Sequence, residues 1–172
     1  GTLAQIADLA TAGCDIIRVA VPDDAAAQAL PAVTAGSGLP VVADIHFDYK
    51  LALAAIEAGV AGLRLNPGNL LDPQHVKEVA AAAKERNIPI RIGVNAGSLP
   101  KDLLAKYGGP APEAMVEAAK RHIGLLEACN FTAIKVSLKA HDVPFTIASY
   151  QQMAAVCDYP LHLGITEAGT PK

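Results

Sequence analysis

Short apolar, β-branched runs alternate with helix-like stretches along the whole chain, and this alternation limits the possible folds more than any other feature. Helical patterns fill most of the intervals, including 2–12, 112–129 and 144–157. A strand followed each time by a helix predicts a parallel sheet with helices outside it. Six runs are predicted as strands: Asp15–Val21, Val41–Phe47, Gly62–Asn66, Ile88–Asn95, Ala133–Lys139 and Pro160–Ile165.

Local signals fix two of the helices. Asp48 can cap a helix that runs through Ala58 before Gly59 stops it, and Asp72-Pro73 opens another that closes near Asn87. The stretch 108–112, Gly-Gly-Pro-Ala-Pro, is typical of a loop inside a long connection from strand to helix.

An internal sequence similarity favours a repetitive architecture. The segment 12–19, AGCDIIRV, resembles 58–65, AGVAGLRL, and both place a glycine stop and an arginine-bearing strand after a helix. No G-x-G-x-x-G follows a strand, so a doubly wound open sheet fits less well than a TIM-type (β/α)8 barrel. Six strands do not close such a barrel. We therefore expect residues 1–172 to form one partial barrel domain that lacks the first and last strands.

Composition excludes several classes of protein. The net charge of −3 argues against a nucleic-acid binder, and no apolar run is long enough to span a bilayer. With no charged-then-apolar leader at the start of the chain, a cytoplasmic protein is expected. Cys14, Cys129 and Cys157 are too scattered to predict a disulfide framework or a metal site.

Because side chains alternate faces along a strand, each run divides into two sets. One set is apolar throughout and should face the helices: Ile17, Val19, Val21, Val41, Ala43, Ile45, Leu63, Leu65, Ile90, Ile92, Val94, Ile134, Val136, Leu138, Leu161, Leu163 and Ile165. The other set should point inward: Arg18, Asp44, His46, Arg64, Asn66, Arg91, Asn95, Lys135, Ser137, Lys139, His162 and Thr166.

A barrel interior is normally filled by branched apolar layers, so this polar interior predicts a binding site. Five of its side chains are cationic although the whole chain is acidic, which favours a ligand carrying phosphate. Asp44 could instead form a buried structural bridge with one arginine. His46 fits either a catalyst at the carboxyl end of its strand or a satisfied interior histidine.

Residues just after the strands could add to such a site. The segments 66–69 and 95–98, Asn-Pro-Gly-Asn and Asn-Ala-Gly-Ser, can present backbone N–H groups to an oxyanion, but such sequences also form ordinary turns. Glu167 follows the last strand and would place a carboxylate at this rim, although a surface acid is an equal alternative.

Four segments together resemble the 4-hydroxy-3-methylbut-2-enyl diphosphate synthase family of the non-mevalonate (MEP) isoprenoid pathway. They are VADIHFDY at 42–49, LNPGN at 65–69, RIGVNAGSL at 91–99 and LGITEAGT at 163–170. The segments RVAVP at 18–22 and SLKA at 137–140 extend the resemblance along the chain.

This resemblance implies an oxidoreductase that converts 2-C-methyl-D-erythritol 2,4-cyclodiphosphate to the linear allylic diphosphate with two electrons and loss of water. It places Arg18, Arg64, Arg91 and Lys139 on the diphosphate, with Ser137 also in the substrate site. It places Asp44, His46, Asn95, Thr166 and Glu167 around the carbon skeleton. Among these, Glu167 is the implied proton donor to the departing hydroxyl, with His46 and Asp44 as the other catalytic candidates.

The family also implies a four-iron four-sulfur (4Fe-4S) cluster held by three cysteines of a C-terminal domain. The spacing of the cysteines in this chain does not match that ligand set, so we expect the chain alone to bind substrate without turning it over. Ferredoxin or flavodoxin as electron donor, and a homodimer, are further implications of the resemblance.

Three rival interpretations remain at this point. The chain could be a pterin-binding barrel of the dihydropteroate synthase type, or an aldolase that uses Lys139 as a Schiff base. It could also be a non-catalytic phosphate-binding or assembly module.

Overall fold

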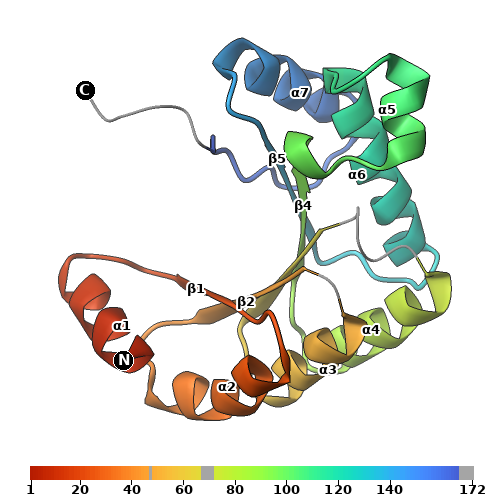
Figure 1. Cartoon of the computed structure of the whole chain (residues 1–172). Helices are drawn as coiled ribbons and strands as arrows, with labels where there is room; N and C mark the ends of the chain where they lie inside the picture. The colour runs from red at the N-terminus through yellow and green to blue at the C-terminus, as the bar shows by residue number, and fades with distance from the viewer. Residues whose placement is uncertain (47, 67–71, 167–172) are drawn as a thin grey trace.

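A computed structural model of the chain describes residues 1–46, 48–66 and 72–166. Its strands form one sheet in which every neighbouring pair is parallel, in the sequential order β1-β2-β3-β4-β5 (Figure 1). The strands are β1 (Ile17–Ala20), β2 (Val41–Ile45), β3 (Gly62–Leu65), β4 (Ile90–Asn95) and β5 (Ile134–Lys139).

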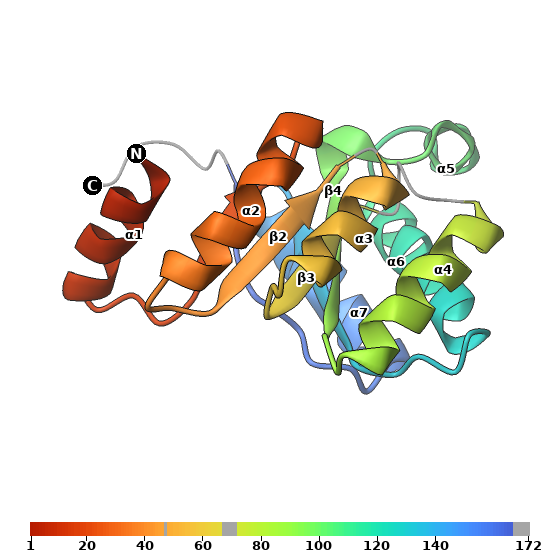
Figure 2. The same ribbon diagram turned by 90° about the horizontal axis from the view of Figure 1, so that it is seen from below.

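Helices alternate with these strands along the chain. They are α1 (Thr2–Thr11), α2 (Asp24–Gly36), α3 (Tyr49–Glu57), α4 (Pro73–Glu85), α5 (Lys101–Tyr107), α6 (Pro112–Glu127) and α7 (Val143–Val156), with a 3₁₀ turn η1 (Ala96–Ser98). Figures 1 and 2 show α2, α3, α4 and α6 along the convex face of the curved sheet. A doubly wound sheet would carry helices on both faces and a reversal of strand order, so the one-sided sequential arrangement confirms the barrel-type fold.

The alternation of the strands was predicted correctly for β1 to β5. The apolar set of these strands packs against the helices, and Ala43, Ile90, Ile92, Val136 and Leu138 are fully buried there. The opposite set therefore lies on the concave face, which is where the polar side chains of the sequence converge.

Aspartate caps begin the helices that the sequence predicted. Asp48 accepts a hydrogen bond from the Lys50 backbone N–H at 2.8 Å, and Asp72 accepts one from Gln74 at 2.8 Å. The two similar segments, 12–19 and 58–65, also share a backbone feature. Gly13 after α1 and Gly59 after α3 have φ of +93° and +85°. Only glycine adopts this left-handed conformation without strain, so each glycine ends its helix and turns the chain into the next strand.

The predicted sixth strand is wrong within the described residues. The segment 160–165 makes only an isolated parallel bridge, between Leu161 and Val136. Tyr150 of α7 explains the interruption, because its hydroxyl accepts from the Leu138 N–H at 3.0 Å and donates to the His162 carbonyl at 2.6 Å. The tyrosine thus occupies the position where Leu138 and His162 would pair directly.

Two of the apolar residues expected to face helices do not. Leu163 is 71% exposed and Ile165 is 40% exposed. The burial assigned to them from the strand alternation is therefore incorrect, since the segment forms no regular strand beyond the bridge at Leu161.

Candidate functional site

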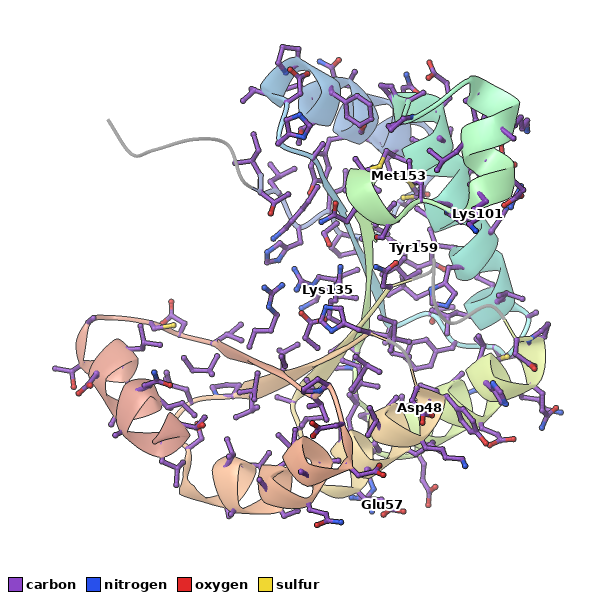
Figure 3. All side chains as sticks on the ribbon, in the orientation of Figure 1. Asp48, Glu57, Lys101, Lys135, Met153 and Tyr159 are labelled. Carbon is purple, nitrogen blue, oxygen red and sulfur yellow. The ribbon has the colours of Figure 1, made fainter. Side chains whose placement is uncertain are left out.

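A row of charged side chains crosses four strands on the concave face. Strand register places Asp44 of β2 beside Arg64 of β3. Arg64 in turn lies beside Arg91 of β4, and Arg91 beside Lys135 of β5. Figure 3 shows Lys135 on the concave side of the sheet, away from the helices. The parallel pairing therefore gathers residues that are up to 91 positions apart into one continuous row.

Asp44 is the anchor of this row. It is 6% exposed, and its Oδ1 accepts a hydrogen bond from Arg64 Nη1 at 3.0 Å. Arg18 Nε lies 3.6 Å from Oδ2, and His46 Nε2 lies 3.9 Å from Oδ1. The alternative that Asp44 forms a buried structural bridge with one arginine thus holds for Arg64, and the half-exposed Arg18 lies near the same carboxylate.

Among the described residues, the remaining cations of the row have no carboxylate partner. Within the strands that the structure describes, Asp44 is the only acidic side chain on the concave face, and no described ion pair includes Arg91, Lys135 or Lys139. One carboxylate cannot neutralise five cations. This face therefore carries an excess of positive charge that an anion can compensate.

The directions in which pKa values are shifted indicate the same excess of positive charge. Burial lowers the pKa of Arg91, and the neighbouring Arg18 and Arg64 lower it further. Burial and then Arg91 likewise lower the pKa values of Lys139 and His162. Burial and like charges thus disfavour the cationic form of each of these groups, and a bound anion would favour it.

Two cavities flank the row. One of about 500 Å³ lies at the carboxyl ends of the strands and is lined by His46, Arg64, Asn66, Asn95, His141 and Thr166, among others. A second of about 460 Å³ lies toward the amino ends, and its polar lining comes from Arg18, Arg91, Lys135, Lys139 and His162. The polar groups of the first cavity are thus mostly uncharged, whereas those of the second are mostly cations set among apolar residues.

Most of the predicted site residues meet in these two cavities, but three do not. Asp44, the buried anchor of the row, lines neither cavity. Ser137 is 2% exposed and lies beside Gly93 in the sheet, outside the lining of both cavities. Glu167 lies outside the described residues, as do residues 67–69 of the predicted Asn-Pro-Gly-Asn turn. Thr166, immediately before Glu167, lines the first cavity.

The second predicted turn uses one of its N–H groups internally. Gly97 donates its backbone N–H to Asn95 Oδ1 at 3.0 Å, so this group is not available to an oxyanion. Nearby, Asn66 Nδ2 donates to Ser98 Oγ at 3.0 Å and joins the loops after β3 and β4. Sequence reasoning missed His141, whose position two residues after β5 was the available signal.

The described residues provide no metal centre. They contain no group of three or more His, Cys, Asp or Glu side chains placed to hold a metal ion. The sulfur atoms of Cys14 and Cys129 lie 3.1 and 3.2 Å from the carbonyl oxygens of Ile16 and Leu125. Among the described helices, none is long and apolar enough to cross a membrane.

Comparison with known proteins gives the family. A family model described as the GcpE TIM-barrel domain matches residues 1–172. The chain belongs to this family. The charged row on the concave face therefore belongs to a GcpE TIM-barrel domain.

Two curated relatives carry the same printed name, 4-hydroxy-3-methylbut-2-en-1-yl diphosphate synthase (flavodoxin). The protein from Maridesulfovibrio salexigens is 62% identical over 169 residues, which cover 98% of this chain and 47% of the relative. The protein from Geobacter sulfurreducens is 62% identical over 169 residues, 98% of this chain and 48% of the relative. This GcpE domain therefore spans about half the length of the curated relatives it matches.

Solved structures agree on the fold. The HMG-CoA lyase from Brucella melitensis superposes with a TM-score of 0.61 at 17% identity, over 94% of this chain and 63% of that chain. At this identity the likeness concerns the fold of the GcpE domain alone.

Proposed function

We propose that this chain is the substrate-binding barrel of a 4-hydroxy-3-methylbut-2-en-1-yl diphosphate synthase. The whole enzyme would open 2-C-methyl-D-erythritol 2,4-cyclodiphosphate to the linear allylic diphosphate, taking up two electrons and releasing water. Family membership and the relatives' names support this reading. The observation that carries it is the row from Asp44 to Lys135, whose excess positive charge matches a compact diphosphate.

In this proposal the two cavities divide the substrate between them. Arg18, Arg91 and Lys139 would hold diphosphate oxygens, because guanidinium forks and an ammonium group suit phosphate. Arg64 would do the same while remaining tied to Asp44. The hydroxylated carbon skeleton would then lie toward the carboxyl ends of the strands, near His46, Asn95 and Thr166.

The proton needed by the departing hydroxyl would come from a group at this rim. Glu167 follows Thr166 and is our first candidate, with His46 next and Asp44 as the carboxylate that faces His46. Arginine side chains are less suited, since they stay protonated and cannot give up a proton. Ser137 stays a predicted substrate-binding residue that would need to reach the ligand from its buried position.

The described residues do not fit an iron–sulfur cluster, so no step of the reaction is assigned to one on this chain. We propose that a four-iron four-sulfur cluster is held by another part of the whole protein. The relatives' names support flavodoxin as electron donor, with ferredoxin as the alternative. A homodimer and a cytoplasmic location complete the proposal.

Binding specificity tests the proposed function. We expect the full-length protein to bind the cyclodiphosphate far more tightly than uncharged methylerythritol, because only the former compensates the cations. Arg91→Met should weaken binding by at least ~1.5 kcal/mol, the scale of a hydrogen bond to a charged group. Isothermal titration calorimetry measures both differences, and Lys77→Met, an exposed change on α4, serves as control. Equal affinities for the two ligands would rule out the phosphate site.

The lowered pKa of Lys139 predicts a pH dependence of binding. The cationic form binds the diphosphate, so binding should raise this pKa and draw a proton onto Lys139 at alkaline pH. Affinity should be fully present below the pKa of the free protein and decline as pH rises through it. Calorimetry in buffers of different ionisation enthalpy measures the uptake, which Lys139→Met should abolish. Proton release on binding would contradict the assignment.

The same lowered pKa favours one second candidate function, an imine-forming aldolase, because an amine must be neutral to attack a carbonyl. Borohydride reduction in the presence of small aldehydes and ketones tests it. A covalent adduct on Lys139 would support the aldolase, and its absence together with cyclodiphosphate binding supports the synthase.

A further inference from the structure

Gly93 occupies a position on the concave face where the strand pattern calls for a side chain. It lies between Arg91 and Asn95 on β4, and its register partner on β5 is Ser137. Gly93 is not among the glycines with positive φ, so the backbone conformation does not require glycine there. Glycine also weakens a strand interior. Space above the backbone is therefore the property that this position needs.

Arg64 occupies that space. Its Nη2 donates to the Gly93 carbonyl oxygen at 3.0 Å. A Cβ atom added to Gly93 would overlap with Arg64 Nε and lie 2.9 Å from both Cζ and Nη2. The guanidinium thus lies directly over the glycine, closer than any side chain at position 93 would permit.

The two ends of the guanidinium are held separately. Nη1 donates to Asp44 on one side and Nη2 to Gly93 on the other, each at 3.0 Å. The Arg64 side chain is only 12% exposed, yet it lines the cavity at the carboxyl ends of the strands. With both terminal nitrogens engaged, the position of the cation in the cavity is determined by Asp44 and Gly93 together.

We propose that Gly93 is a positioning residue for Arg64, setting where this cation meets the ligand; the ligand's identity rests on the proposed function. A side chain at position 93 would displace the flexible end of Arg64 and leave the backbone of β4 in place. The guanidinium would then lose its hydrogen bond to the carbonyl of residue 93 and move from its position in the cavity.

A double-mutant cycle in the full-length protein tests this inference. We expect Gly93→Ala to weaken cyclodiphosphate binding at least about tenfold, the equivalent of one charged hydrogen bond. In an Arg64→Met background the same change should have little further effect, because the group through which Gly93 acts is already gone. Gly124→Ala is the control, since a Cβ added there meets nothing within 4 Å. Effects that simply add would overturn the inference and assign Gly93 a general packing role.

A ligand-free readout separates this inference from the proposed function. A crystal structure of the Gly93→Ala variant should show the Arg64 guanidinium moved off β4 while the sheet is unchanged. An unmoved guanidinium would refute the positioning role whatever the protein binds. If the native protein fails to bind the cyclodiphosphate but the guanidinium moves, the proposed function fails and the positioning role stands.

Discussion

Replacing Asp44 with alanine is expected to lower the free energy of unfolding by about 3 kcal/mol. The carboxylate is 6% exposed, and removing it leaves Arg64, whose side chain is 12% exposed, without its anionic partner. Losing one member of a buried ion pair costs this much because the other charge stays desolvated and unpaired. Arg91 is also affected, since Asp44 is the carboxylate that raises its pKa against burial and like charge.

Urea denaturation of the full-length protein, followed by circular dichroism, measures the loss. Asp44→Asn keeps an acceptor oxygen for Arg64 and should cost less than the alanine variant. Asp8→Ala, an exposed change on α1, should stay within about 0.5 kcal/mol of the native protein. An Asp44→Ala variant as stable as Asp8→Ala would show that the arginines are stabilised by other groups.

The sheet was predictable because period-two patterning is a local signal. Apolar residues such as Ile90 and Ile92 alternate with Arg91 in the sequence, and burial on the helix side then leaves Arg91 one possible face. Once the strands are parallel and sequential, the meeting of Asp44, Arg64 and Arg91 follows from their similar positions along each strand.

The prediction of a sixth strand was wrong because a side chain from another element interrupts its pairing with β5. Tyr150 belongs to α7, and nothing in its own segment indicates that its hydroxyl will lie between Leu138 and His162. Local patterning reports which residues favour a strand, whereas backbone pairing depends on what reaches the edge of the neighbouring strand.

Gly93 was missed for a different reason. The strand pattern indicates which side chains point inward, and a glycine has no side chain. Its contribution is visible only once Arg64 of the adjacent strand is placed over it. Ser137 shows the converse, since its inward position was read correctly from the pattern but its burial depends on packing that the pattern does not contain.

Replacing Glu167 with glutamine in the full-length enzyme, assayed with its electron donor, is expected to reduce turnover by roughly 10²-fold or more, the usual scale of general acid–base catalysis. Glutamine keeps the size of the side chain and removes the proton that a carboxyl group can transfer. Substrate affinity should change little, because the cations supply most of the binding.

Steady-state turnover and calorimetric affinity, measured on the same variant, separate the two contributions. His46→Gln is the informative companion, since His46 lines the same cavity and its Nε2 lies 3.9 Å from Asp44. If Glu167 is the acid, the glutamine variant loses turnover at every pH, whereas a change at His46 leaves a larger residual rate. A Glu167→Gln enzyme with near-normal turnover, or one that fails only through lost affinity, would transfer the acid role to His46, a histidine that lines the cavity and lies near a carboxylate able to orient it.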